Sequence, residues 1–341
     1  MKFDFCIGNP PYQENSAGEK ISDASLYAEF MDAAYTVADR VELVTPARFL
    51  FDNGNTSSSW NKKMLNDEHF KVLLYESDSS KIFPKPIDIK GGVAIHYRDV
   101  NREYGAIGCF TSFPELNNIL KKVTKTNPES IMKIIYNQNR FNLDNLYVDY
   151  PNLKNVISSD GRERRMTSGC IVYPCFSDSR NAKDDIQIMG YTGAKRVNRY
   201  INRKYVDVVE DCNLEKYKVI IPANNGAGSI GEVLSNPIIG KPFMGFTQTF
   251  ISFGSYDNQD VAENTMKYIK TKFARTLLSV LKVTQNGKKP VWKHVPLQNF
   301  TSDSDIDWRG SVAEIDKQLY KKYKLSKEEI NFIETHVKEM V

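Results

Sequence analysis

Few residues of this sequence are suited to bind metals or to form disulfides. The five cysteines, Cys6, Cys109, Cys170, Cys175 and Cys212, are odd in number and include no Cys-x-x-Cys pair. The four histidines are scattered along the chain. We therefore expect neither a zinc site nor a disulfide framework. Free thiols fit a reduced, cytoplasmic setting best.

Long apolar runs are also missing. No stretch of about 18 apolar residues occurs, so neither a membrane span nor a membrane partner is expected. The N-terminal segment MKFDFCIGNPP is too short and too interrupted to serve as a signal peptide. The 341 residues are 41% apolar and 26% charged, which is typical of a globular chain with two domains of ordinary size.

Charge is distributed unevenly along the chain. The overall net charge is +4, but residues 1–105 carry −4, residues 301–341 carry −2 and the middle segment 106–300 carries +10. A basic segment between neutral or acidic ends indicates a polyanion partner or an ordinary solvated basic surface. Charge alone leaves both interpretations open.

Strands and helices are predicted to alternate in residues 1–105, which favours an α/β layered domain. Expected strands lie at 2–8, 40–46, 70–77 and 92–100; expected helices lie at 22–39, capped by Ser22 or Asp23, and near 57–67. Residues 106–300 read as a second, α+β domain with one long helix at about 260–283. Residues 301–341 form a helical tail with a break near 322–329.

The stretch Asn9-Pro10-Pro11-Tyr12 follows the first expected strand directly. Proline fixes φ, and the residue before each proline is pushed into an extended conformation. The Asn9 side-chain oxygen and the Pro10 carbonyl are thereby two acceptors held in fixed relation, beside the flat face of Tyr12. In an open α/β fold this end of a strand is where ligands bind. The alternative is that the two prolines only end the strand.

Two acceptors beside an aromatic face suit an aryl amine. Hydrogen bonds to both amine hydrogens leave the nitrogen lone pair free and aim it at a methyl donor. An amine inside a nucleic-acid duplex is inaccessible, so its base has to be flipped out and stacked between apolar or aromatic groups.

The segment FDFCIGNPPYQ resembles the catalytic motif of the DNA methyltransferases that modify adenine at N6, and residues 26–50 and 81–97 resemble later segments of the combined restriction–modification methylases. The resemblance implies that Asn9, Pro10, Pro11 and Tyr12 form the catalytic motif. It implies that Phe83, followed by Pro84, packs against the flipped adenine opposite Tyr12. Phe83 is alternatively a loop residue anchored in the core. The segments from Tyr217 and Tyr268 onward resemble the target-recognition half of such enzymes.

The same resemblance implies S-adenosylmethionine as the methyl donor. Its main binding loop and the acidic residue for its ribose lie upstream of the motif in this family, and only eight residues precede Asn9. The expected fold is therefore the C-terminal part of a Rossmann-like methyltransferase sheet, from the fourth strand onward, followed by an α+β target-recognition domain. We expect an incomplete enzyme: a fragment, a split subunit, or a vestigial enzyme that keeps DNA recognition. We also expect pairing along residues 2–7, with an upstream half, another restriction–modification subunit or a second copy.

Residues 226–231, GAGSIG, match the G-x-G-x-x-G pattern of nucleotide-binding loops and follow an expected strand. A dinucleotide site needs a helix that opens on the third glycine, and Pro237 follows Gly231 by only six residues. We therefore expect turns, or a loop that approaches DNA backbone, rather than a cofactor site.

Basic residues interleaved with aromatics in the middle segment suit contacts with double-stranded DNA. Such clusters are alternatively solvated surface. The candidates are Arg162, Arg164, Arg165, Lys195, Arg196, Arg199, Lys288 and Lys289.

Three functions remain open from the sequence. The first is a DNA adenine-N6 methyltransferase component of a restriction–modification system. The second is a target-recognition module without catalysis of its own. The third is a protein glutamine methyltransferase, since enzymes of that kind also use Asn-Pro-Pro-Tyr, although the long basic segment after residue 105 is unlike them. No acidic-plus-lysine cluster indicates a nuclease.

Overall fold

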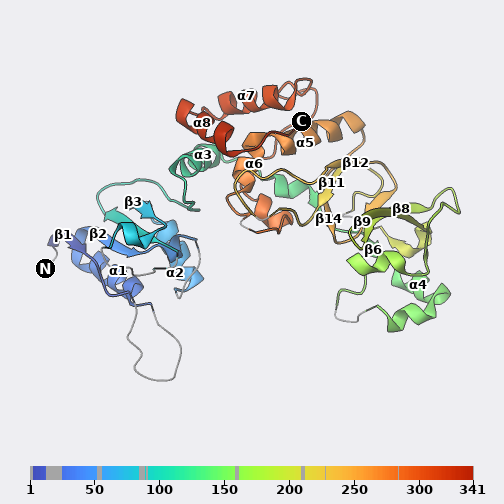
Figure 1. The fold of residues 1–341 in the computed structure, drawn as a ribbon, viewed down its shortest axis with the longest axis horizontal. Helices are drawn as coiled ribbons and strands as arrows, with labels where there is room; N and C mark the ends of the chain where they lie inside the picture. The colour runs from blue at the N-terminus through green and yellow to red at the C-terminus, as the bar shows by residue number, and fades with distance from the viewer. Residues whose placement is uncertain are drawn as a thin grey trace. The chain divides into compact units, whose positions relative to one another are not determined.

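The computed structural model describes residues 3–12, 25–51, 56–83, 89, 91–157, 161–208, 212–226, 228–282 and 284–340. Figure 1 shows a mixed α/β chain with several sheets. The chain divides into two compact units, Met1–Lys121 and Lys122–Val341. No helix in the described part is long and apolar enough to cross a membrane.

The first unit contains one four-stranded sheet in the order β1-β2-β4-β3. Its strands are β1 (Phe3–Gly8), β2 (Ala38–Pro46), β3 (Phe70–Glu76) and β4 (Val93–Asp99). Its helices are α1 (Leu26–Val37) and α2 (Ser58–Leu65), and α3 (Pro114–Lys125) spans the boundary to the second unit. β1 and β2 are parallel and joined by α1, whereas β2, β4 and β3 pair antiparallel. The strands and helices expected from residues 1–105 are thereby confirmed.

Helix α1 packs on the sheet because Tyr27, Met31 and Ala34 recur at helical spacing and are all buried. The helix begins after Ser25, so its N-cap is not Ser22 or Asp23, which lie outside the described residues. In the sheet, His96 is fully buried, and burial lowers the pKa of its imidazole to about 3. The neutral ring contacts the Thr45 hydroxyl at 3.1 Å through Nε2, so this histidine belongs to the core.

Strand β1 forms one edge of this sheet among the described residues, with β2 as its neighbour. Phe3, Phe5 and Ile7 alternate along it, and their exposed fractions are 59%, 43% and 73%. The pairing of residues 2–7 with a further strand stays a prediction.

The second unit contains three small sheets, in the orders β12-β11-β14-β5, β13-β8-β9-β7 and β10-β6. The strands are β5 (Ile135–Tyr136), β6 (Arg140–Phe141), β7 (Phe176–Ser177), β8 (Ile186–Thr192), β9 (Lys195–Ile201), β10 (Val206–Asp207), β11 (Tyr217–Pro222), β12 (Ile238–Gly240), β13 (Met244–Phe246) and β14 (Phe250–Tyr256). The helices are α4 (Leu143–Asp149), α5 (Gln259–Lys270), α6 (Lys272–Leu278), α7 (Val312–Lys322) and α8 (Lys327–His336).

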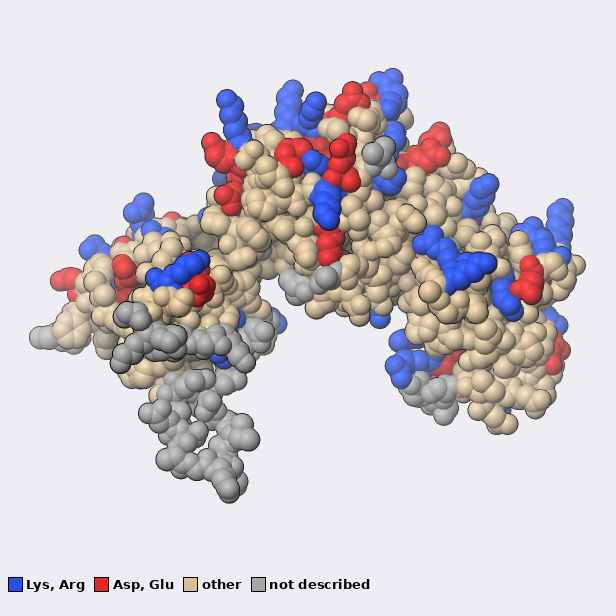
Figure 2. All heavy atoms as spheres, in the orientation of Figure 1, with Lys and Arg blue, Asp and Glu red and all other residues tan. Residues whose placement is uncertain are grey.

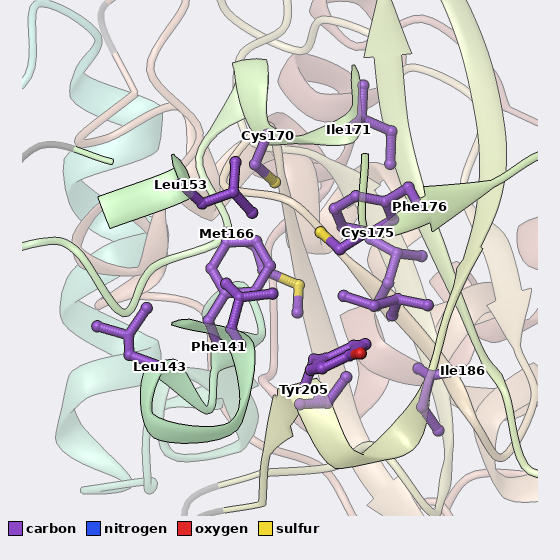
Figure 3. Packing of buried hydrophobic residues seen from close by; sticks show 14 of the residues in the cluster. Phe141, Leu143, Leu153, Met166, Cys170, Ile171, Cys175, Phe176, Ile186 and Tyr205 are labelled. Atoms are coloured by element: carbon purple, nitrogen blue, oxygen red, sulfur yellow. The ribbon is translucent and has the colours of Figure 1, made fainter. Parts of the chain in front are cut away.

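A hydrophobic cluster lies between α4, β8 and the segments around them (Figure 3). Phe141 and Met166 are its centre, with exposed fractions of 1% and 0%. Cys170 and Cys175 are free thiols within it, and burial raises the pKa of Cys175 to about 12. These cysteines are core residues rather than reactive thiols.

The prediction of one long helix at about 260–283 is wrong. The helix is interrupted at Thr271, which separates α5 from α6. The Thr271 hydroxyl accepts a hydrogen bond from the backbone N–H of Ala274 and caps the second helix. The buried carboxylate of Asp316 on α7 accepts hydrogen bonds from the backbone N–H groups of Lys272 and Phe273, both at 2.9 Å. A residue 45 positions after Thr271 thus stabilises the break.

The boundary between the compact units lies at residue 121 rather than at 105. Residues after 104 remain tied to the first unit, because the backbone N–H of Gly105 donates to Glu68 and that of Gly108 donates to Leu65. Residues 301–341 belong to the second compact unit, and their α7 and α8 are the two helices expected for the tail.

Candidate functional site

The Asn-Pro-Pro-Tyr motif lies at the carboxyl end of β1, where β1 runs parallel to β2 and Gly8 pairs with Leu43. Asn9 and Pro11 are exposed, Pro10 is buried and Tyr12 is half-buried. Tyr12 packs against the core of the first unit. The loop is thus anchored at Pro10 and Tyr12 and presents Asn9 to solvent, in the position that ligands favour in open α/β sheets.

The structure brings Phe83 to Tyr12, although 70 residues separate them along the chain. The two ring centroids lie 6.5 Å apart and the ring planes form an angle of 65°. Phe83 is fixed through its backbone N–H, which donates to the Ser79 carbonyl at 3.0 Å in the short helix Ser79–Lys81. Pro84, the other half of the expected Phe-Pro pair, lies outside the described residues.

The distance between the two ring centroids is close to the distance that would hold a base between them. The angle between the ring planes is not, because a base stacks only on parallel rings. Stacked bases lie about 3.4 Å apart, so two parallel rings about 7 Å apart would hold one base between them. At 65° the edge of one ring instead points at the face of the other. One ring has to rotate before a base can stack on both.

The hydroxyl of Tyr12 is buried and has no hydrogen-bond partner among the described residues. Burial raises the pKa of this phenol to about 12. Tyr12 is therefore neutral at physiological pH, and what it presents toward Phe83 is an uncharged ring.

The basic candidates of the second unit fall into two groups. Arg164 pairs with Asp207 at 3.7 Å, Arg199 pairs with Asp178 at 3.0 Å, and the Lys289 ammonium donates to the Ile135 carbonyl at 3.0 Å. The side chains of Arg165, Lys195 and Lys288 are exposed and have no partner in the described part of the chain, and Arg162 is exposed too. Within the described residues, the side chains of Arg165, Lys195 and Lys288 are therefore available to contact a polyanion.

Figure 2 shows Lys and Arg side chains gathered over the part of the second unit that carries β8, β9 and α4. The net charge is +8 in residues 122–341 and −4 in residues 1–121.

Arg196 belongs to the basic second unit, and its guanidinium lies 5.4 Å from the ring centroid of Phe250. Phe250 in turn stacks on Tyr191, with centroids 5.2 Å apart and planes at 7°.

A hollow of about 260 Å³ lies beside Phe250, and we call it the amide hollow. Arg165 and Lys288 line it, so the structure brings these two sequence candidates together. Sequence analysis missed the other polar residues of its lining, among them Gln138, Arg140 and Gln248. They come from segments about 110 residues apart and share no local pattern, so only the fold places them in one site.

In the described part of the GAGSIG loop, backbone donors are engaged by a side chain of the same chain. The carboxylate of Glu232 accepts hydrogen bonds from the backbone N–H groups of Gly228 at 2.8 Å and Ser229 at 2.9 Å. The same carboxylate pairs with the buried Lys282 ammonium at 2.7 Å. The donors that would bind a phosphate in a nucleotide loop therefore bind a side chain of the protein itself.

Among the described residues, no three His, Cys, Asp or Glu side chains come together in a way that could hold a metal ion.

Trp292, which the sequence places among lysines, is fully buried, and its indole N–H donates to the Gly287 carbonyl at 2.9 Å. It is a core residue and does not contact solvent.

Three comparisons with known proteins cover different shares of the chain. Residues 1–83 match the family model of the Eco57I restriction-modification methylase. An uncharacterized adenine-specific methylase of Mycoplasma pneumoniae is 31% identical over 96 residues, which make up 27% of this chain and 22% of that protein. A solved structure of the type IIG restriction endonuclease BpuSI is 10% identical, covers 93% of this chain and 50% of that chain, and has a TM-score of 0.32. A TM-score of this size does not establish a shared fold. For the residues that they cover, the first two matches confirm the resemblance to restriction–modification and adenine-specific methylases.

Proposed function

We infer that this chain, whose residues 1–83 match the Eco57I restriction-modification methylases, supplies the adenine-binding part and the target-recognition part of a DNA adenine-N6 methyltransferase. The observation that carries this proposal is the meeting of Tyr12 and Phe83 beside the exposed Asn9. The basic second unit supports double-stranded DNA as the partner. A cytoplasmic location is part of the proposal.

The four-stranded sheet of the first unit is, in this proposal, part of a Rossmann-like methyltransferase sheet. The parallel β1–α1–β2 unit and the position of the motif at its carboxyl end support this assignment. The edge of β1 that pairs with no strand in the described part of the chain is where further strands would join. An upstream methyltransferase half, another restriction–modification subunit or a second copy would supply them.

The chemistry assigned to the motif is the orientation of an amine. The Asn9 side-chain oxygen and the Pro10 carbonyl accept hydrogen bonds from the two N6 hydrogens of a flipped-out adenine. Tyr12 and Phe83 stack on the two faces of the base. S-adenosylmethionine, the donor that the methylase family implies, supplies an electrophilic methyl group when it is bound. Asn9 is exposed and therefore accessible to such a donor.

Methyl transfer to DNA tests this proposal directly. The chain, alone and together with the polypeptide of its neighbouring gene, is incubated with unmethylated genomic DNA and labelled S-adenosylmethionine. N6-methyladenine is then measured after digestion. We expect Asn9→Ala to abolish the product, whereas Asn101→Ala, which changes another exposed asparagine of the first unit, should leave it intact. Equal product from both variants would contradict the assignment of Asn9.

A further inference from the structure

We propose that the amide hollow reads base edges in the major groove of duplex DNA, with Gln138, Arg165 and Gln248 as the reading side chains. This inference rests on the proposed function, because DNA methylation is what brings duplex DNA to the second unit. It goes further by assigning sequence specificity to three named residues in one place.

The hollow has a rigid frame, because three chain segments are joined there by backbone hydrogen bonds. The N–H of Met166 donates to the Asn139 carbonyl at 3.0 Å, and the N–H of Gln248 donates to the Met166 carbonyl at 2.8 Å. The Asn139 N–H donates to the Phe246 carbonyl at 3.1 Å, and its side-chain oxygen accepts from the Phe246 N–H at 2.9 Å. These hydrogen bonds hold the backbone next to each reading residue in place, as a specific binding site requires.

The reading side chains themselves are uncommitted. Within the described residues, no hydrogen bond or ion pair engages the side chains of Gln138, Arg165 or Gln248. Arg165 and Gln248 are exposed, and Gln138 is half-buried. The donors and acceptors of these three side chains are therefore available to a ligand.

The chemistry of these side chains matches base edges better than phosphates. A glutamine amide offers one donor and one acceptor side by side and pairs with N6 and N7 of adenine, whereas an arginine fork pairs with O6 and N7 of guanine. Phosphate oxygens only accept, so they would make no use of the acceptor oxygens of Gln138 and Gln248. Lys288 on the rim and Lys195 on β9 are the residues suited to phosphates.

The acidic residue in the lining does not oppose this assignment. Asp207 lies within 3.7 Å of the Arg164 guanidinium, and three cations, Arg140, Arg165 and Lys288, line the same hollow. The balance of charge in the lining is therefore positive, as a site on DNA requires.

Selection from a randomised pool of duplexes tests the proposal without knowledge of the recognition sequence. The full chain retains duplexes from a pool with a random 20-base-pair core (a length chosen to exceed about one helical turn of about 10 base pairs), and the retained pool is sequenced. Gln138→Ala and Gln248→Ala should each lose about tenfold or more of discrimination at one position. Arg165→Gln should change a preference for guanine into one for adenine, which a merely structural role would not do.

Two control variants distinguish a loss of base recognition from a general loss of DNA affinity. Gln285→Ala removes an exposed glutamine outside the hollow and should keep the wild-type preferences. Lys195→Ala should weaken binding to all duplexes alike and reduce the slope of log K against log salt by about 0.9. Circular dichroism melts of each variant verify that the second unit is folded.

The outcomes are distinct. If Gln138→Ala, Gln248→Ala and Arg165→Gln all select the wild-type consensus, base reading in the amide hollow is wrong, while DNA targeting by the chain stands. If the wild-type chain binds duplexes without any preference, the inference also fails. If the folded wild-type chain retains no duplex at all, the proposed DNA function fails with it.

Discussion

Asn139 offers the sharpest test of how the amide hollow is built. Replacement by alanine removes the oxygen that accepts from the Phe246 N–H at 2.9 Å and the amide that donates to Cys212 Sγ at 3.8 Å. Asn139 is 7% exposed and Phe246 is 1% exposed, so the N–H left behind has little access to water. A buried donor without an acceptor costs about 1–3 kcal/mol.

The neighbouring Asn137 provides the matched control. It is exposed and its side chain has no partner among the described residues, so Asn137→Ala should change the free energy of unfolding by no more than about 0.5 kcal/mol. For a unit of this size, 1 kcal/mol corresponds to about 2–4 °C in melting temperature. We therefore expect Asn139→Ala to melt several degrees below Asn137→Ala.

The assay is calorimetry combined with tryptophan fluorescence, since Trp292 and Trp308 are buried in the second unit and report its melting. Gln138 and Arg140 flank Asn139. In the duplex selection, Asn139→Ala should therefore show weaker discrimination between bases than the wild-type chain. Equal melting temperatures for the two asparagine variants would refute the view that Asn139 fixes the frame of the hollow.

Three further changes test other parts of the structure. Tyr12→Phe removes a buried hydroxyl that has no hydrogen-bond partner among the described residues, so thermal melts should show equal or higher stability and methyl transfer should persist. Tyr12→Ala should lower both, and loss of transfer in Tyr12→Phe would contradict this reasoning. Burial raises the pKa of Asp316 to about 6, above its unfolded value, so its contribution to stability is present below about pH 4 and lost as the pH rises through 6. Urea unfolding of Asp316→Asn at pH 4, 5 and 6 should show that this part of the pH dependence has gone, and a dependence like that of the wild type would refute the shift. Glu232→Gln leaves the Lys282 ammonium, whose side chain is 5% exposed, without its carboxylate, so urea unfolding at pH 7 should show a loss of about 3 kcal/mol; an unchanged midpoint would show that the pair contributes little.

The first unit was predictable from the sequence because its signals are local. The apolar runs at 40–46 and 70–77 and the helix over Leu26–Val37 depend on residues that follow one another in the chain. The break at Thr271 was not predictable, since the periodicity of apolar residues continues through it and the stabilising carboxylate of Asp316 comes from a distant helix.

In the candidate sites, too, contiguous residues were predictable from the sequence and contacts between distant residues were not. The motif Asn9–Tyr12 is contiguous and was identified directly, and its partner Phe83 followed from family resemblance; the ring contact places the two side by side but leaves their roles as proposals. Basic clusters were less informative, because the sequence does not show whether a cation has a partner. Arg199 pairs with Asp178, whereas Arg165 has no side-chain partner among the described residues. Gln138 and Gln248 carried no signal before the fold joined their segments.

The loop around Gly228 has a consequence for ligand selectivity. A phosphate could enter it only as a competitor of the protein's own anion, since Glu232 occupies the N–H groups and is held there by Lys282. The intramolecular carboxylate is present at a constant, high effective concentration, so a nucleotide phosphate would have to displace it to reach these N–H groups. The glycine spacing of a nucleotide-binding loop therefore serves an internal contact in this chain, and a polyanion on the second unit would depend on its exposed cations.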